Sequence, residues 1–292
     1  MKNFDEAALG RIAKRANAML RDLKRSTREQ FGEAFPAPHT PERTAAADAV
    51  IAALAAVDRA FAAYHLSASM SYCDCCTDPE LIARLITTPR DDLSDDDVAS
   101  VVGSLLFTLG NTNDLKYFVP RFLRDTLATP LYDIDSMFAR FERAGFDGWP
   151  DAERSAVRGY LRAFWRCVLL TSPCRGLTTL TDPWLDVLDG MASLGFIGDA
   201  LALWDAEHGD AAQSRLLDLL DFLDVGPASF GVVGVGGYAH NSAGYDVLER
   251  WLRSPVVSTR IDAALEPVRS VDGELANRID GVLSALTARQ RE

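Results

Sequence analysis

The chain has 292 residues, of which 48% are hydrophobic and 25% are charged. This composition is typical of a folded globular protein and excludes a disordered one. The longest apolar runs, such as 98–109, are interrupted by polar residues well before the roughly 18 residues that a membrane-spanning helix requires. Three of the five cysteines lie within four positions, which suits reduced thiols better than a disulfide framework. We therefore expect a soluble, cytoplasmic protein.

The net charge of −12 is unevenly distributed along the chain. Residues 1–30 contain eight Lys or Arg and four Asp or Glu, so the remaining residues carry −16. A strongly acidic body repels nucleic acids and anionic membranes and attracts cationic molecules. The charge therefore favours a basic protein as the partner and disfavours nucleic acid and membrane surfaces.

Apolar residues recur at spacings of three and four along nearly the whole chain, which predicts helices. Three predicted helices follow good N-capping residues, namely Thr40, Asp78 and Ser94. The helices are expected over 4–23, 41–64, 79–87, 98–109, 112–127, 134–144, 151–171, 183–194, 197–207, 211–224, 244–253, 256–266 and 272–289.

Only residues 230–235 have the β-branched and aromatic character of a strand, and this stretch is too short and too rich in glycine to build a sheet alone. The predicted fold is therefore all-α, in a single domain over 1–292 with a candidate hinge near 171–176. Short links between helices favour an irregular α-solenoid of HEAT- or armadillo-like pairs, with a large helical bundle as the alternative.

The cysteine-rich segment is the most unusual part of the sequence. Cys73 and Cys76 have the spacing at which two thiolates share one tetrahedral Zn²⁺, and His65, Cys167 and Cys174 are candidates to complete the site. Cysteine is also among the most buried residue types, so packing of small thiols at a helix junction is the competing interpretation. The cofactor prediction is thus either none or a structural zinc ion.

The same segment carries a resemblance to other proteins. Residues 72–80 read YCDCCTDPE, residues 117–123 read YFVPRFL, and Trp149 with Pro150 follows. Together these segments resemble an uncharacterised group of bacterial all-helical proteins. The resemblance covers about residues 70–170, implies a bacterial, intracellular helical domain, and implies no activity, cofactor or catalytic residue.

Acidic residues cluster between the third and fourth predicted helices. Asp91, Asp92 and Asp95 match the D-D-x-x-D pattern with which all-α prenyl-diphosphate synthases hold magnesium on a diphosphate. Ser94 is expected to cap the next helix, however, and the aspartates in the first turn after it complement the helix dipole. Because the body of the chain is strongly acidic, we predict that Asp95, Asp96 and Asp97 are contacts for a basic partner.

A glycine-rich stretch over 226–244 predicts a long loop between helices. Loops of this length are often functional in compact domains. The polar-tipped residues on or beside it, Tyr238, His240, Asn241 and Tyr245, are candidate partner contacts. A disordered connector is the alternative interpretation.

These features favour a protein–protein interaction module over an enzyme. The four histidines lie in no recognisable nucleophile motif, and stacked helical pairs usually bind other proteins. A bacterial immunity protein that neutralises a basic toxin fits the acidic charge. The alternative is a metal-dependent all-α enzyme.

The helical periodicity leads to the first testable prediction. Far-ultraviolet circular dichroism of the purified chain should show a helix content well above the globular average of about one third. A spectrum with a substantial strand contribution would contradict the predicted fold class.

Overall fold

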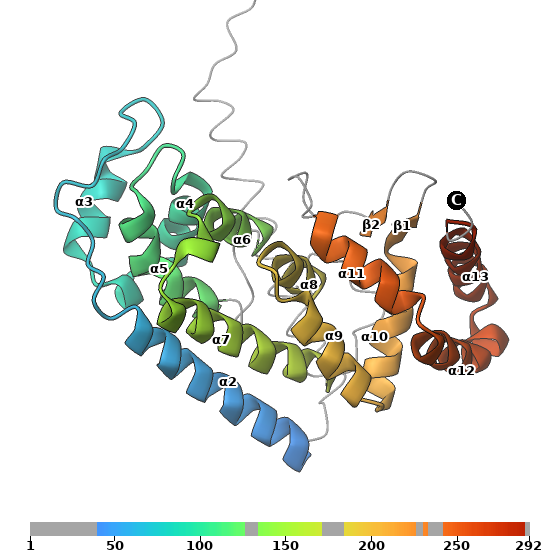
Figure 1. The fold of residues 1–292 in the computed structure, drawn as a ribbon. Coiled ribbons are helices and arrows are strands. Elements are labelled where there is room, and N and C mark those ends of the chain that lie inside the picture. The colour runs from blue at the N-terminus through green and yellow to red at the C-terminus, as the bar shows by residue number, and fades with distance from the viewer. Residues whose placement is uncertain (1–39, 126–133, 171–183, 226–229, 233–241, 290–292) are drawn as a thin grey trace, which may run out of the picture.

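The computed structural model describes residues 40–125, 134–170, 184–225, 230–232 and 242–289, and Figure 1 shows that helices dominate them. The α-helices in this part of the chain are α2 (Pro41–Ala60), α3 (Pro79–Thr87), α4 (Asp95–Ser104), α5 (Thr112–Asp125), α6 (Ile134–Arg143), α7 (Asp151–Leu169), α8 (Trp184–Ser193), α9 (Ile197–Ala206), α10 (Asp210–Asp221), α11 (Ser242–Leu252), α12 (Pro255–Val271) and α13 (Gly273–Ala288). Two single-turn 3₁₀ helices, η1 (Arg90–Asp92) and η2 (Phe146–Gly148), precede α4 and α7. The all-α prediction is therefore confirmed.

Side-chain caps fix the starts of three helices where the sequence predicts them. The Thr40 side chain accepts a hydrogen bond from the Arg43 N–H at the start of α2. Asp78 accepts one from the N–H of Glu80 at the start of α3. Ser94 caps α4 in the same way. Each cap satisfies a backbone donor that the first helical turn leaves without a partner.

Helix α4 ends earlier than its apolar sequence suggests, at Ser104 instead of residue 109. The backbone of Leu105 is extended and that of Leu106 has a φ of 64°, which is incompatible with a continuing right-handed helix. Residues 105–110 instead form a tight turn, in which the Leu106 N–H donates to the Leu109 carbonyl at 2.9 Å. The apolar side chains of Leu105 and Leu109 are buried in this turn, so the periodicity reflects burial and not helix.

The C-terminal third differs from the prediction in two places. Helix α12 continues through Pro267 to residue 271, because Leu265 and Val268 on either side of the proline remain buried against the core. The predicted loop over 226–244 contains strand β2 (Phe230–Val232), which pairs antiparallel with β1 (Leu223–Val225). In the register, residue 223 faces 232 and residue 225 faces 230. The expectations of helix to 224 and of loop throughout 226–244 were therefore wrong at these residues.

The helices follow one another roughly in chain order along the molecule, from α3 at one end to α13 at the other (Figure 1). Contacts join neighbours such as α8 with α9 and α12 with α13. Helices also contact others two or three places along the chain, such as α6 with α8 and α10 with α13. Helix α2 makes a longer-range contact, because it lies along α7 and also contacts α5. This long-range contact joins the N-terminal part of the described chain to its middle.

Large aromatic side chains fill the centre of this arrangement. Trp165 of α7, Trp184 of α8 and Trp204 of α9 are buried, and their ring centroids lie 5.4 to 6.3 Å apart. The indole N–H of Trp165 donates to the Ala200 carbonyl at 3.0 Å, which satisfies its one polar group. These three tryptophans therefore belong to the core.

None of the described helices has both the length and the apolar character that crossing a membrane requires. The predicted first helix over 4–23 and the candidate hinge at 171–176 lie outside the described residues.

The packing of α8 on α6 gives a prediction about two glycines. A Cβ atom at Gly190 would collide with the Phe138 ring, whereas one at Gly159, on the exposed side of α7, would meet nothing within 4 Å. Gly190→Ala should destabilise the protein by about 1–3 kcal/mol through overpacking. Gly159→Ala should stabilise it by roughly 0.5–1 kcal/mol, because alanine loses less backbone entropy. Urea denaturation measures both, and equal effects of the two substitutions would contradict this packing.

Candidate functional site

Three cysteine thiols gather in the turn that precedes α3. The Cys73 and Cys75 sulfur atoms are 3.0 Å apart, and those of Cys75 and Cys76 are 3.4 Å apart. All three sulfur atoms lie within 4.8 Å of one another. Cys75 and Cys76 are exposed and Cys73 is half-buried, so the group opens to solvent at the surface.

Backbone hydrogen bonds hold this turn against residues 105–110. The Cys73 N–H donates to the Thr108 carbonyl at 2.8 Å, and the Gly110 N–H donates to the Ser71 carbonyl at 2.7 Å. Within the turn, the N–H groups of residues 76 and 77 both donate to the Cys73 carbonyl at 3.0 Å. The early end of α4 thus creates the neighbouring turn that supports the cysteines.

The Cys73 and Cys75 thiols do not ionise independently. A hydrogen bond from the Cys75 side chain lowers the pKa of Cys73, because it stabilises the Cys73 thiolate. The same bond to Cys73 keeps Cys75 in its neutral form and raises the pKa of Cys75 to about 12. Three thiolates at this separation repel one another, so full ionisation requires a cation among them.

The structure assembles only part of the predicted zinc ligand set. Cys73 and Cys76 lie together, but the third member of the group is Cys75, which the C-x-x-C pattern omits. His65 is exposed, and among the described residues neither it nor Cys167 belongs to the group. Cys167 is on the last turn of α7, where burial raises the pKa of its thiol. Cys174 lies outside the described residues.

The aspartates at the start of α4 differ in their surroundings. Asp97 is buried, and its carboxylate forms an ion pair with Arg84 at 2.8 Å. This ion pair lowers the pKa of Asp97. Asp95 is exposed and lies 3.2 Å from an Arg121 nitrogen. Asp96 is exposed in the first helical turn. Asp97 is therefore an internal structural residue, and the expectation that it offers its carboxylate to a partner is corrected.

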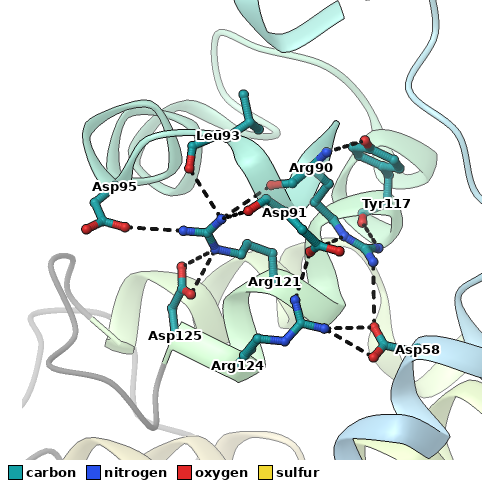
Figure 2. A network of polar contacts seen from close by, with 9 residues as sticks. All are labelled: Asp58, Arg90, Asp91, Leu93, Asp95, Tyr117, Arg121, Arg124 and Asp125. Carbon is teal, nitrogen blue, oxygen red and sulfur yellow. Dashed lines mark hydrogen bonds and ion pairs between the residues drawn. The ribbon is translucent and has the colours of Figure 1, made fainter. Parts of the chain in front are cut away.

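Figure 2 shows arginines next to Asp91 and Asp95, two of the three aspartates of the D-D-x-x-D pattern. Arg121 donates to the carbonyls of Asp91 and Leu93 at 3.0 and 3.3 Å, and its Nε lies 2.8 Å from Asp125. Arg124 pairs with the Asp91 carboxylate at 2.8 Å. Arginines thus pair with two of the three carboxylates of the pattern, and the network holds the 90–95 segment against α5.

Of the four contact residues predicted on or beside the glycine-rich segment, only Tyr245 lies in the described part of the chain. Tyr238, His240 and Asn241 lie outside the described residues. Tyr245 is buried on α11, where its hydroxyl donates to the Asp189 carboxylate and its ring packs edge-on against Phe230. Tyr245 is therefore a packing residue, and its assignment to a partner-binding loop is corrected.

A polar triad joins the segment that follows α2 to α5 and α7, and the sequence patterns did not indicate it. Lys116 and Glu153 are buried and Tyr64 is half-buried. The Lys116 ammonium lies 2.8 Å from the Glu153 carboxylate and donates to the Tyr64 hydroxyl at 3.2 Å, which donates to Glu153 at 2.6 Å. Burial alone would lower the pKa of Lys116, but the contacts with Glu153 and Tyr64 outweigh it and raise that pKa. The ammonium also lies 4.8 Å from the Trp149 ring centroid.

No family model, curated protein or solved structure matches this chain.

The polar triad leads to a prediction about paired substitutions. Glu153→Leu alone leaves the Lys116 ammonium buried without its anion, and Lys116→Met alone leaves the carboxylate without its cation. Each should cost about 3–5 kcal/mol, while the double variant should cost much less than the sum, because a packed apolar pair replaces a desolvated ion pair. Urea denaturation of the four proteins provides the test, and additive effects would contradict a direct pairing.

Proposed function

We propose that this protein is a helical protein-interaction module that binds a basic protein through its acidic surface. The chain has 42 Asp and Glu against 30 Lys and Arg. Burial does not reduce this excess among the described residues, because the buried charged side chains are five cations and four anions: Lys116, Arg121, Arg140, Arg215 and Arg260, and Asp97, Asp114, Glu153 and Glu249. The surplus of carboxylates at the surface is the observation that supports this proposal.

Two of the buried arginines, Arg140 and Arg260, are bound to helix ends and add no positive charge to the surface. Arg140 donates to the carbonyls of residues 102 and 103 near the end of α4. Arg260 donates to the carbonyls of residues 204 and 207 at the end of α9. These guanidinium groups donate to carbonyls in and just after the last turn of each helix, where few backbone donors remain. They are consequently withdrawn from the surface that a partner meets.

We further propose that the helices form an irregular α-solenoid. The contacts between helices that are close in sequence, and their progression along the molecule (Figure 1), favour it over a bundle. Such an architecture exposes broad surfaces that suit protein partners. Asp95 and Asp96 remain candidate contacts on it, and a bacterial immunity protein that neutralises a basic toxin is the specific role that we favour. The negative surface disfavours nucleic acids and anionic membranes as partners.

A metal-dependent enzyme is the second candidate function. The observation that favours it is the group of three thiols at residues 73, 75 and 76. Turnover that requires added metal, in a preparation that captures no basic protein, would select this alternative.

The interaction proposal predicts a salt-dependent encounter. A partner captured from the native host should be basic, and its association rate should fall as the salt concentration rises past the point where the Debye length is about 8 Å. Its dissociation rate should change less, because long-range attraction acts mainly on the encounter. Surface plasmon resonance over a salt series measures both rates. A captured partner that associates at the same rate at all salt concentrations would contradict electrostatic recognition.

A further inference from the structure

We propose that Cys73, Cys75 and Cys76 form an open three-thiolate site for a thiophilic divalent cation of the zinc type. This site goes beyond the proposed interaction with a basic protein. It also differs from the ligand set that the sequence suggested, because it includes Cys75 and draws all three protein ligands from one turn.

The positions of the sulfur atoms suit such an ion after a small adjustment. Zn–S bonds of about 2.3 Å at tetrahedral angles place two sulfur atoms about 3.8 Å apart. The two shortest separations in the turn are 3.0 and 3.4 Å, and all three sulfur atoms lie within 4.8 Å of one another. Rotation of the exposed side chains of Cys75 and Cys76 opens these separations without moving the core.

The backbone of the turn is already held in place before any ion binds. Its start is hydrogen-bonded to the 105–110 turn through the Cys73 N–H. At its end, the N–H groups of residues 76 and 77 donate to the Cys73 carbonyl. Thr77 is buried at the end of this segment. A turn that is anchored at both ends loses less conformational entropy when three of its side chains converge on one ion.

The charge around the thiols favours a cation. Asp74, Asp78 and Glu80 are all exposed within or directly after the turn. Their carboxylates add to the negative charge of the thiolates, which are themselves the soft ligands that zinc-type ions prefer. The field at the turn therefore attracts a thiophilic cation and opposes an anionic ligand.

The site is open because one coordination position lacks a protein ligand from the described residues. The group of candidate ligands there consists of the three cysteines alone, and two of them are exposed. A closed structural zinc site uses four protein ligands, whereas a site with three retains a position for water or an external ligand. We infer that solvent reaches the fourth position of this one.

The test uses the full-length chain, reduced, metal-free and free of oxygen. Zn²⁺ is titrated in competition with a chromophoric chelator, and Cd²⁺ is titrated while the thiolate-to-metal charge-transfer absorption is followed. We expect one ion per chain. Cys73→Ser, Cys75→Ser and Cys76→Ser should each weaken binding by about 100-fold or more, since even an outer-shell partner of a metal site contributes 10–100-fold.

Matched controls separate this ligand set from the alternatives. Cys167→Ser, Cys174→Ser and His65→Ala should each retain the stoichiometry and the affinity of the natural chain. Circular dichroism of every variant reports whether the fold is intact. Three results would overturn the proposal: no ion bound by the reduced chain, unchanged binding in Cys75→Ser, or loss of binding in any of the three controls.

Discussion

The buried ion pair of Lys116 and Glu153, joined by the Tyr64 hydroxyl, is the constraint on which the N-terminal half of the structure depends. The side chains of Lys116 and Glu153 are 8% and 6% exposed, and a desolvated charge is tolerated only with its partner in place. Tyr64 follows α2, Lys116 is on α5 and Glu153 is in the first turn of α7. Together with Tyr64, the pair therefore ties the segment that follows α2 to α5 and α7, before the chain reaches the cysteine-rich turn.

The arginines have a related structural role at the helix ends. Arg121 holds the 90–95 segment through its backbone carbonyls (Figure 2), and Arg140 and Arg143 hold the end of α4 and the Leu106 carbonyl. The guanidinium groups of Arg140 and Arg143 both lie over the Phe107 ring, 4.1 and 4.3 Å from its centroid. Arg121 and Arg140 are buried, so these two cations stabilise the interior and the helix termini and add no positive charge to the surface.

The cysteine-rich turn depends on the end of α4, which the arginines stabilise. Its support is the 105–110 turn, which exists because Leu106 adopts a left-handed conformation and ends α4. Arg143 then stabilises the carbonyl of that strained residue at 3.0 Å. A surface group of three thiols is thus carried on a backbone whose position is set by the core beneath it, which is the combination that a preorganised ligand site requires.

The sequence by itself determined most of the helices and their starting points, because apolar periodicity and capping by Thr40, Asp78 and Ser94 are local properties. It also determined the acidic character and the closeness of Cys73 and Cys76. It did not reveal that Asp97 pairs with Arg84, that Tyr245 is buried against Asp189, or that Lys116 meets Glu153. Each of these depends on residues 13 to 56 positions apart, whose contact is decided only when whole helices pack. The ends of α4 and α12 were likewise decided by tertiary burial, which overrides local helix propensity where apolar side chains have a core to fill.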